Sequence, residues 1–121
     1  MNPLNINQQI TWVYTEDLDT TAAFYGSQLG LALTRDEGAA KIFRVSASAS
    51  IGVCIAFDDR VVEPAGSMIT FVTDEVDAWH QTLEARGVTI SKPPHVLEKF
   101  GIYTFFAEDP NGYAIEFQQF L

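Results

Sequence analysis

Two stretches, ITWVYTEDLD at residues 10–19 and MITFVTDEVD at residues 68–77, repeat one pattern in the two halves of the chain. In each stretch a run rich in β-branched and aromatic residues enters an acidic turn. An apolar helical period follows each turn and predicts helices over residues 19–29 and 77–86, for which the turn aspartates suit N-caps. Gly30 and Gly87 then stand where a helix commonly ends in the left-handed conformation. The repeat therefore predicts two copies of one supersecondary unit.

Turn signals divide the rest of each half into short strands. The predicted strands cover residues 31–34, 39–45 and 51–57 in the first half, and 88–91, 101–107 and 113–120 in the second. Each half then reads β-α-β-β-β, which gives modules at about residues 8–58 and 67–121, joined by a polar linker, within one domain over residues 1–121. Two prolines within residues 92–95 predict an irregular stretch there, which either folds over a cleft or forms an ordinary surface loop.

Composition narrows the classes of partner. With 47% hydrophobic and 19% charged residues, the 121-residue chain is typical of one globular domain. A net charge of −9 and only seven Lys and Arg argue against nucleic-acid binding, which needs cations to neutralise phosphates. No apolar run approaches the ~20 residues of a membrane helix, and no signal peptide is visible. We therefore expect no membrane partner and a cytoplasmic location, with which the lone Cys54 agrees.

Several short motifs resemble those of the vicinal oxygen chelate superfamily, which includes glyoxalases, bleomycin-resistance proteins and extradiol dioxygenases. They are DL at 17–18, FY at 24–25 and LG at 29–30 in the first half, and DPNGY at 109–113 with IE at 115–116 in the second. The resemblance covers nearly the whole chain. It implies an α+β fold in which two tandem βαβββ modules form an open, barrel-like mixed sheet around a cleft, with helices on the convex side. It also implies a homodimer.

Metal-binding members of this superfamily draw ligands from the opening strand and the last strand of each module. The matching positions in the opening strands are Ile10 and Met68, neither of which suits the metals that this fold holds. The last strand of the second module supplies Glu116, whereas that of the first offers Val53 or Cys54. We therefore expect no metal and no cofactor. The alternative is a makeshift site built from Cys54, Glu116 and a displaced Gln8 or Gln9.

Neither histidine is expected to supply the missing ligands. His80 is predicted on the exposed side of the second helix, and His95 lies in the proline-flanked stretch. A catalytic metal site needs about three protein ligands and one open position, which this set of residues hardly provides.

Strand alternation predicts which side chains face the cleft. The predicted ligand-binding residues are Trp12, Tyr14, Cys54, Met68, Thr70, Glu116 and Gln118. Each has an ordinary alternative: the aromatic residues could be core, Cys54 a buried small hydrophobe, and Glu116 a solvated strand residue. A carboxylate within a cleft would need a ligand cation, a hydrogen-bond donor or a proton of its own.

Two functional classes follow, and no catalytic residue is identified. The first is metal-independent binding of a small aromatic or cationic molecule, resembling the drug-sequestering proteins of the bleomycin-resistance type. The alternative is an enzyme: a glyoxalase-like lyase or isomerase, or a dioxygenase, with an atypical metal site, or a metal-free enzyme with Glu116 as general base. Fold alone does not separate the two classes.

Overall fold

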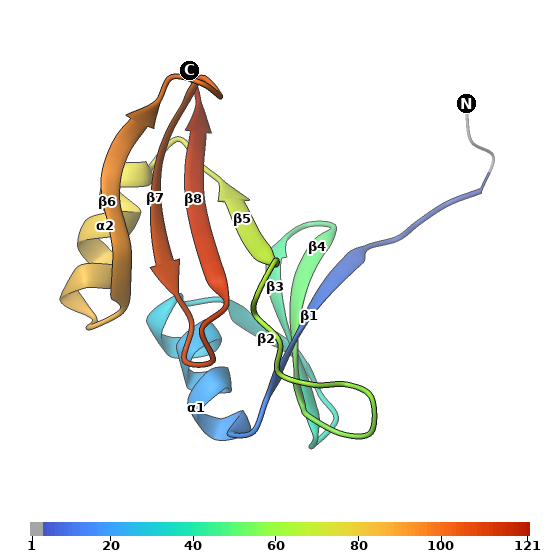
Figure 1. Ribbon diagram of the computed structural model, residues 1–121. Helices are drawn as coiled ribbons and strands as arrows, with labels where there is room; N and C mark the ends of the chain where they lie inside the picture. The colour runs from blue at the N-terminus through green and yellow to red at the C-terminus, as the bar shows by residue number, and fades with distance from the viewer. Residues whose placement is uncertain (1–3) are drawn as a thin grey trace. The chain divides into compact units, whose positions relative to one another are not determined.

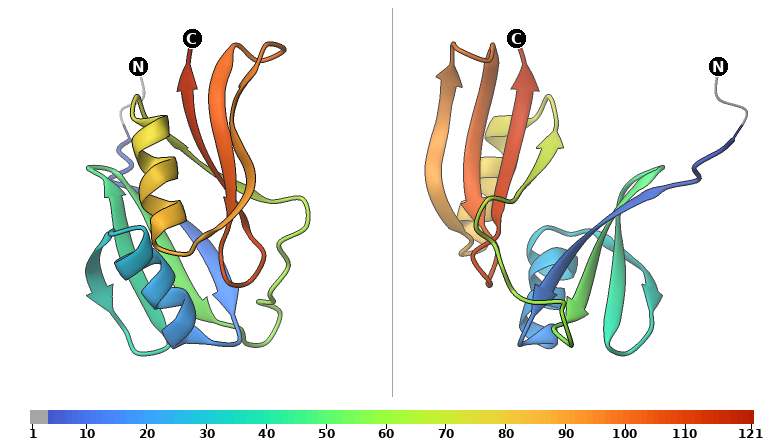
Figure 2. Two further views of the ribbon diagram at one scale, coloured as in Figure 1. Left: turned by 90° about the vertical axis from the view of Figure 1, so that its left-hand side faces the viewer. Right: turned by 45° about the vertical axis from the view of Figure 1, so that its right-hand side comes forward.

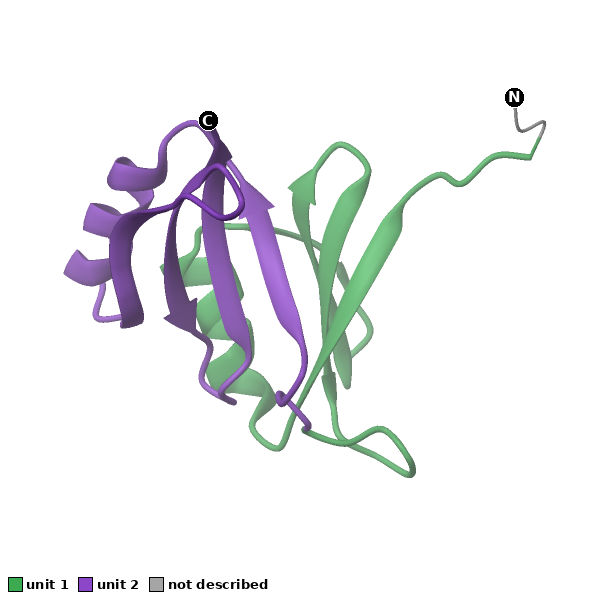
Figure 3. Ribbon diagram, turned by 45° about the horizontal axis from the view of Figure 1, so that its top comes forward, with its two compact units in different colours: residues 1–62 green, residues 63–121 purple. Residues whose placement is uncertain are grey.

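The structure, a computed structural model that describes residues 4–121, divides into two compact units, the first ending at Val62 and the second beginning at Glu63 (Figure 3). Each unit has the predicted order β-α-β-β-β and holds one open, four-stranded mixed sheet. The boundary falls within the predicted linker. Across residues 4–121, no helix has both the length and the apolar character needed to cross a membrane.

The first unit has the strand order β1-β4-β3-β2, with β1 parallel to β4 and the other pairs antiparallel (Figure 1). Its core lies between the sheet and the helical segment, where Val13, Phe24, Tyr25, Phe43 and Val53 are almost fully buried. The elements are β1 (Gln9–Thr15), α1 (Leu18–Ala23), η1 (Phe24–Gln28), β2 (Ala32–Asp36), β3 (Ala40–Ser46) and β4 (Ala49–Ile55).

The second unit repeats this arrangement with the strand order β5-β8-β7-β6 and β5 parallel to β8. Helix α2 packs against β6, β7 and β8 and covers one face of the sheet (Figure 2). Phe117 lies at the centre of the core between helix and sheet, with ring centroids 5.0 Å from both Trp79 and Phe105. The elements are β5 (Met68–Val72), α2 (Val76–Ala85), β6 (Thr89–Leu97), β7 (Ile102–Glu108) and β8 (Ala114–Phe120).

The helix ends follow the predicted signals in most respects. Asp17 caps α1 by accepting from the Thr20 N–H at 3.2 Å, and its bonds with the Thr20 hydroxyl and N–H hold the pKa of Asp17 below its usual value. Gly30 and Gly87 both have φ of 77°, as predicted. Two details differ: α1 continues as the π-helix η1 over Phe24–Gln28, and the N-cap of α2 makes no side-chain hydrogen bond.

The prediction for residues 92–95 is confirmed only in part: the stretch is irregular in its pairing with β7, but β6 runs without a break from Thr89 to Leu97, so neither a surface loop nor a segment folded over a cleft forms there. A strand tolerates Pro93 and Pro94 here because β6 is the edge of its sheet, where a missing N–H need not cost a ladder bond. Register shifts on either side of Lys92 absorb the irregularity.

The prediction that His80 lies on the exposed side of its helix is wrong. The His80 ring packs edge to face on Phe105, with centroids 5.3 Å apart, and only 18% of the side chain is exposed. His80 therefore belongs to the core of the second unit. The face of α2 that packs on the sheet is wider than the stripe of apolar residues in its sequence.

Candidate ligand-binding site

The open face of the second sheet, opposite α2, carries four of the predicted site residues. Strand pairing sets Thr70 beside Glu116 and Val72 beside Gln118, and Met68 lies on the same face of β5. The next residues in each strand, such as Phe117, point toward α2 instead. The predicted alternation of these two strands is therefore observed.

The carboxylate of Glu116 is held at both oxygens by hydroxyl groups. Thr70 donates to Oε1 at 2.9 Å, and Thr104, on the neighbouring strand β7, donates to Oε2 at 2.8 Å. The side-chain amide of Gln118 is assigned the orientation in which its nitrogen faces Glu116. In this orientation the nitrogen donates to Oε1 at 3.1 Å and to Oε2 at 3.2 Å. Only 4% of Glu116 is exposed, so it is not the solvated strand residue of the ordinary alternative.

Glu116 lines a groove of about 410 Å³, a volume within the usual range of small-molecule sites. Its polar lining comes from Glu116 and Gln118. The rest of the lining is apolar and consists of Met68, Leu97, Phe100, Ile102, Phe106 and Phe120. Several of these side chains are open to approach, since Met68 is 54% and Phe100 66% exposed.

The hydrogen bonds that hold the Glu116 carboxylate come from neutral groups. Among residues 4–121, none of the ion pairs involves this carboxylate. Burying a carboxylate costs free energy, which hydrogen bonds from neutral groups offset only in part. A ligand cation, or a ligand N–H or O–H, would complete its environment.

The first unit holds the other three predicted residues, on β1 and β4. The indole of Trp12 lies directly over Gly52, where an added Cβ would come within 2.4 Å of the Trp12 ring. Glycine is thus the residue that leaves room for this ring, which is 37% exposed. The Tyr14 hydroxyl accepts from Arg60 at 3.3 Å, and Cys54 is buried with its thiol donating to the Ile55 carbonyl at 3.3 Å.

Strand register identifies the first unit's counterpart of Glu116. Glu116 pairs with Thr70, and the residue that corresponds to Thr70 in the first repeat is Trp12, which pairs with Gly52. The counterpart of Glu116 is therefore Gly52, and the sequence prediction of Val53 or Cys54 is wrong by one or two residues. The error arose because the two modules differ in length before their last strands, so that sequence alone did not fix the register.

The donor set does not fit a metal of the kind that this superfamily binds. Three of the four positions are Ile10, Gly52 and Met68, and none of them offers the nitrogen or oxygen ligand that such a metal prefers. Within the described part of either unit, no three His, Cys, Asp or Glu side chains gather into a possible metal site. Gln8, considered for a makeshift site, instead accepts a hydrogen bond from the Ser50 hydroxyl at 3.3 Å.

This donor set predicts low metal retention. Protein purified without chelator from metal-supplemented medium should carry well under one equivalent of Ni, Zn, Fe or Mn, because Glu116 alone cannot complete a site. Elemental analysis by mass spectrometry measures the content, and Glu116→Gln is the matched variant. Near-stoichiometric metal that this variant loses would contradict the prediction.

Sequence reasoning missed Thr104, which is fully buried and donates to Glu116. A threonine in a strand carries no motif, so the only available signal was its place on β7 relative to β8, which requires the register. The groove residues from the end of β6 and the following turn, Leu97 and Phe100, were missed for the same reason.

The chain consists of two copies of a β-α-β-β-β unit, and the last strand of the second copy carries a glutamate. These features agree with the superfamily that the sequence motifs resemble. The sequence model of the Glyoxalase/Bleomycin resistance protein/Dioxygenase superfamily matches residues 6–117, and the chain belongs to this superfamily. No curated protein matches the chain in sequence.

Solved structures extend this result at the level of the fold. A glyoxalase/bleomycin resistance protein/dioxygenase from Nocardioides is 18% identical, with a TM-score of 0.80 over 100% of this chain and 87% of that one. Lactoylglutathione lyase from Agrobacterium tumefaciens is 24% identical, with a TM-score of 0.76 over 98% and 95% of the two chains. TioX from Micromonospora sp. ML1 is 16% identical, with a TM-score of 0.79 over 94% and 98%.

Proposed function

We propose that the protein binds a small aromatic or otherwise apolar molecule that carries a cationic or hydrogen-bond-donating group, and that it does so without a bound metal. The observation that carries the proposal is the buried carboxylate of Glu116 in the apolar groove of the second unit. The apolar lining would bury the body of the ligand, and Glu116 would orient it through its polar group.

The details of the Glu116 environment support binding by a preorganised carboxylate. Its hydroxyl donors, Thr70 and Thr104, fix both oxygens, so little side-chain entropy is lost when a ligand arrives. The Lys92 ammonium lies 5.6 Å from the ring centroid of Phe106 in the groove, and this contact between a cation and an aromatic ring supports the proposal of a cationic ligand group.

Other parts of the proposal rest on the superfamily resemblance. Trp12, Tyr14 and Cys54 of the first unit are proposed as further ligand contacts, and the protein is proposed to act as a homodimer. Of these three residues, Trp12 offers the most accessible surface.

The test is a thermal-shift screen of paired compounds, each an aromatic amine and its neutral isostere. Amines should raise the melting temperature of the wild type more than their isosteres do, since stabilisation reports affinity. Glu116→Gln should weaken amine binding by about tenfold, because it removes a charge-assisted bond to a carboxylate that is itself buried.

Glu108→Gln is the matched control. Glu108 pairs with Ala114 on the same sheet, is exposed and is not part of the groove lining, so its replacement removes an equal charge without touching the site. The proposal fails if Glu116→Gln leaves the shift of every bound compound unchanged. If the wild type instead needs a metal to bind, and Glu116→Gln abolishes that metal, the enzyme alternative replaces the proposal.

A further inference from the structure

The first unit has a concave pocket of its own, with a different chemistry. Its volume is about 360 Å³, and the residues that line it include two arginines, Arg35 and Arg44, together with Thr34, Ser46 and Ser50. No Asp or Glu lines it, although the chain has sixteen acidic residues against seven Lys and Arg. A cationic pocket free of acids stands out on a protein of net charge −9.

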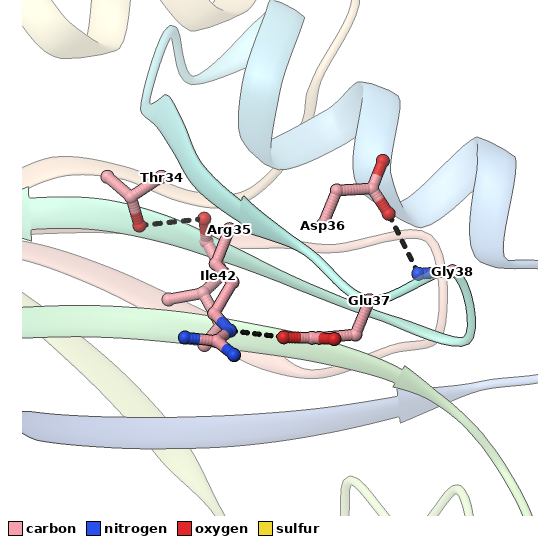
Figure 4. Close-up of polar contacts among 6 residues, drawn as sticks. All are labelled: Thr34, Arg35, Asp36, Glu37, Gly38 and Ile42. Carbon is pink, nitrogen blue, oxygen red and sulfur yellow. Dashed lines mark hydrogen bonds and ion pairs between the residues drawn. The ribbon is translucent and has the colours of Figure 1, made fainter.

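A β-bulge turns Arg35 into this pocket. Leu33 pairs with Phe43 and Arg35 pairs with Ile42, so Thr34 is an extra residue on β2. Without the bulge, Arg35 would pair with Lys41 and point to the opposite face of the sheet. The Thr34 hydroxyl donates to the Ile42 carbonyl at 3.2 Å and fixes the bulge (Figure 4).

The two guanidinium groups retain donors for a ligand. Within residues 4–121, the side chain of Arg44 forms no hydrogen bond or ion pair. Arg35 bonds to Glu37 through Nε, which leaves both terminal nitrogens outside that ion pair (Figure 4). Five N–H donors in a planar fork match the oxygens of a carboxylate or phosphate.

The other acid of the same hairpin, Asp36, is also already paired. Asp36 accepts from Lys41 at 2.7 Å and from the Gly38 N–H at 2.9 Å, and these bonds hold the pKa of Asp36 below its usual value. Asp36 therefore does not supply the counter-charge of Arg44.

We propose that this pocket binds the oxyanion of a small molecule, a carboxylate or a phosphate group. Arg44 is the principal contact, with the terminal nitrogens of Arg35 and the Ser46 hydroxyl as further donors. The site lies wholly within the first unit, so it is separate from the groove at Glu116 and does not depend on the function proposed for that groove.

The experiment is an NMR titration of the ¹⁵N-labelled protein with two probes, citrate and pyrophosphate. Binding should give saturable shifts at the backbone amides of Ser46, Ala47 and Ser50, and added NaCl should weaken it. The tighter probe distinguishes a carboxylate site from a phosphate site. Arg44→Gln should weaken binding by about tenfold or more, and Arg44→Lys by less, because lysine keeps the charge but loses the planar fork.

Arg86→Gln is the control, because it makes the same change of charge in the second unit, outside the pocket lining. It should leave the affinity unchanged, as should Glu116→Gln, which separates this proposal from the function proposed for the groove. Absence of saturable shifts with both probes would overturn the proposal. Equal weakening by Arg44→Gln and Arg86→Gln would overturn it as well, since bulk charge would then explain the binding.

Discussion

Phe117→Ala should lower the free energy of unfolding by about 3–5 kcal/mol, the usual cost of deleting a buried phenyl ring. The ring is 2% exposed and meets three aromatic neighbours: it stacks on Phe105 at 5.0 Å and 4°, lies 5.0 Å from Trp79, and contacts Phe71 at 5.2 Å. These neighbours belong to three different elements and cannot all close on the cavity. Whole domains are stable by only about 5–15 kcal/mol, so this loss of stability would be a large fraction of the total and easy to measure.

Urea denaturation followed by tryptophan fluorescence measures the loss, because Trp79 lies against the ring that is removed. Phe120→Ala is the control on the same strand: its ring is 65% exposed, and its replacement should change stability by about 0.5 kcal/mol or less. A loss below about 1 kcal/mol in Phe117→Ala would mean that the core of the second unit does not depend on this stack.

The repeat in the sequence predicted most of the fold because its signals are local. Strand alternation, acidic turns and the glycines at positions 30 and 87 act within a few residues, so each element could be placed from its own segment. The π-helical turn after α1 and the continuous β6 were not predicted. Both depend on packing and on position in the sheet, which outweigh local propensity.

The site was predicted less completely, because it depends on register. Glu116 and Gln118 were found from a motif and from alternation, but Thr104, which holds the same carboxylate, comes from another strand. The position of Gly52 could not be predicted from the sequence for the same reason. Gly52 is the first unit's counterpart of Glu116, and only its pairing with Trp12 identifies it as such. Contacts between strands distant in sequence are not encoded in any one segment.

The two units have diverged on equivalent faces of their sheets. Where the second unit has a carboxylate and an apolar groove, the first has a glycine under an indole and, farther along the face, two arginines. The strand order is the same in both, so the difference lies in side chains and in one bulge. The two proposals thus assign ligands of opposite charge to the two units, and they can be tested separately with variants at Glu116 and Arg44.

Thr104→Val should lower the free energy of unfolding by about 1–3 kcal/mol, the cost of leaving a buried acceptor without its donor. Valine keeps the volume and loses the hydroxyl that donates to Glu116 at 2.8 Å and to the Phe117 carbonyl at 3.1 Å. Water cannot replace it readily, because Thr104 has no exposed surface. Thr70→Val is the matched control: Thr70 donates to the same carboxylate but is exposed, so water can take its place and the loss should be smaller.

A double-mutant cycle with Glu116→Gln assigns the cost to the carboxylate. If the Thr104 hydroxyl mainly serves the charge on Glu116, the loss on Thr104→Val should shrink in the Glu116→Gln background, because a neutral amide oxygen is a weaker acceptor. Urea denaturation of the four proteins gives the coupling energy, which should be at least about 0.5 kcal/mol. Equal losses in the two backgrounds would show that the hydroxyl serves only the Phe117 carbonyl, and that Glu116 is held without it.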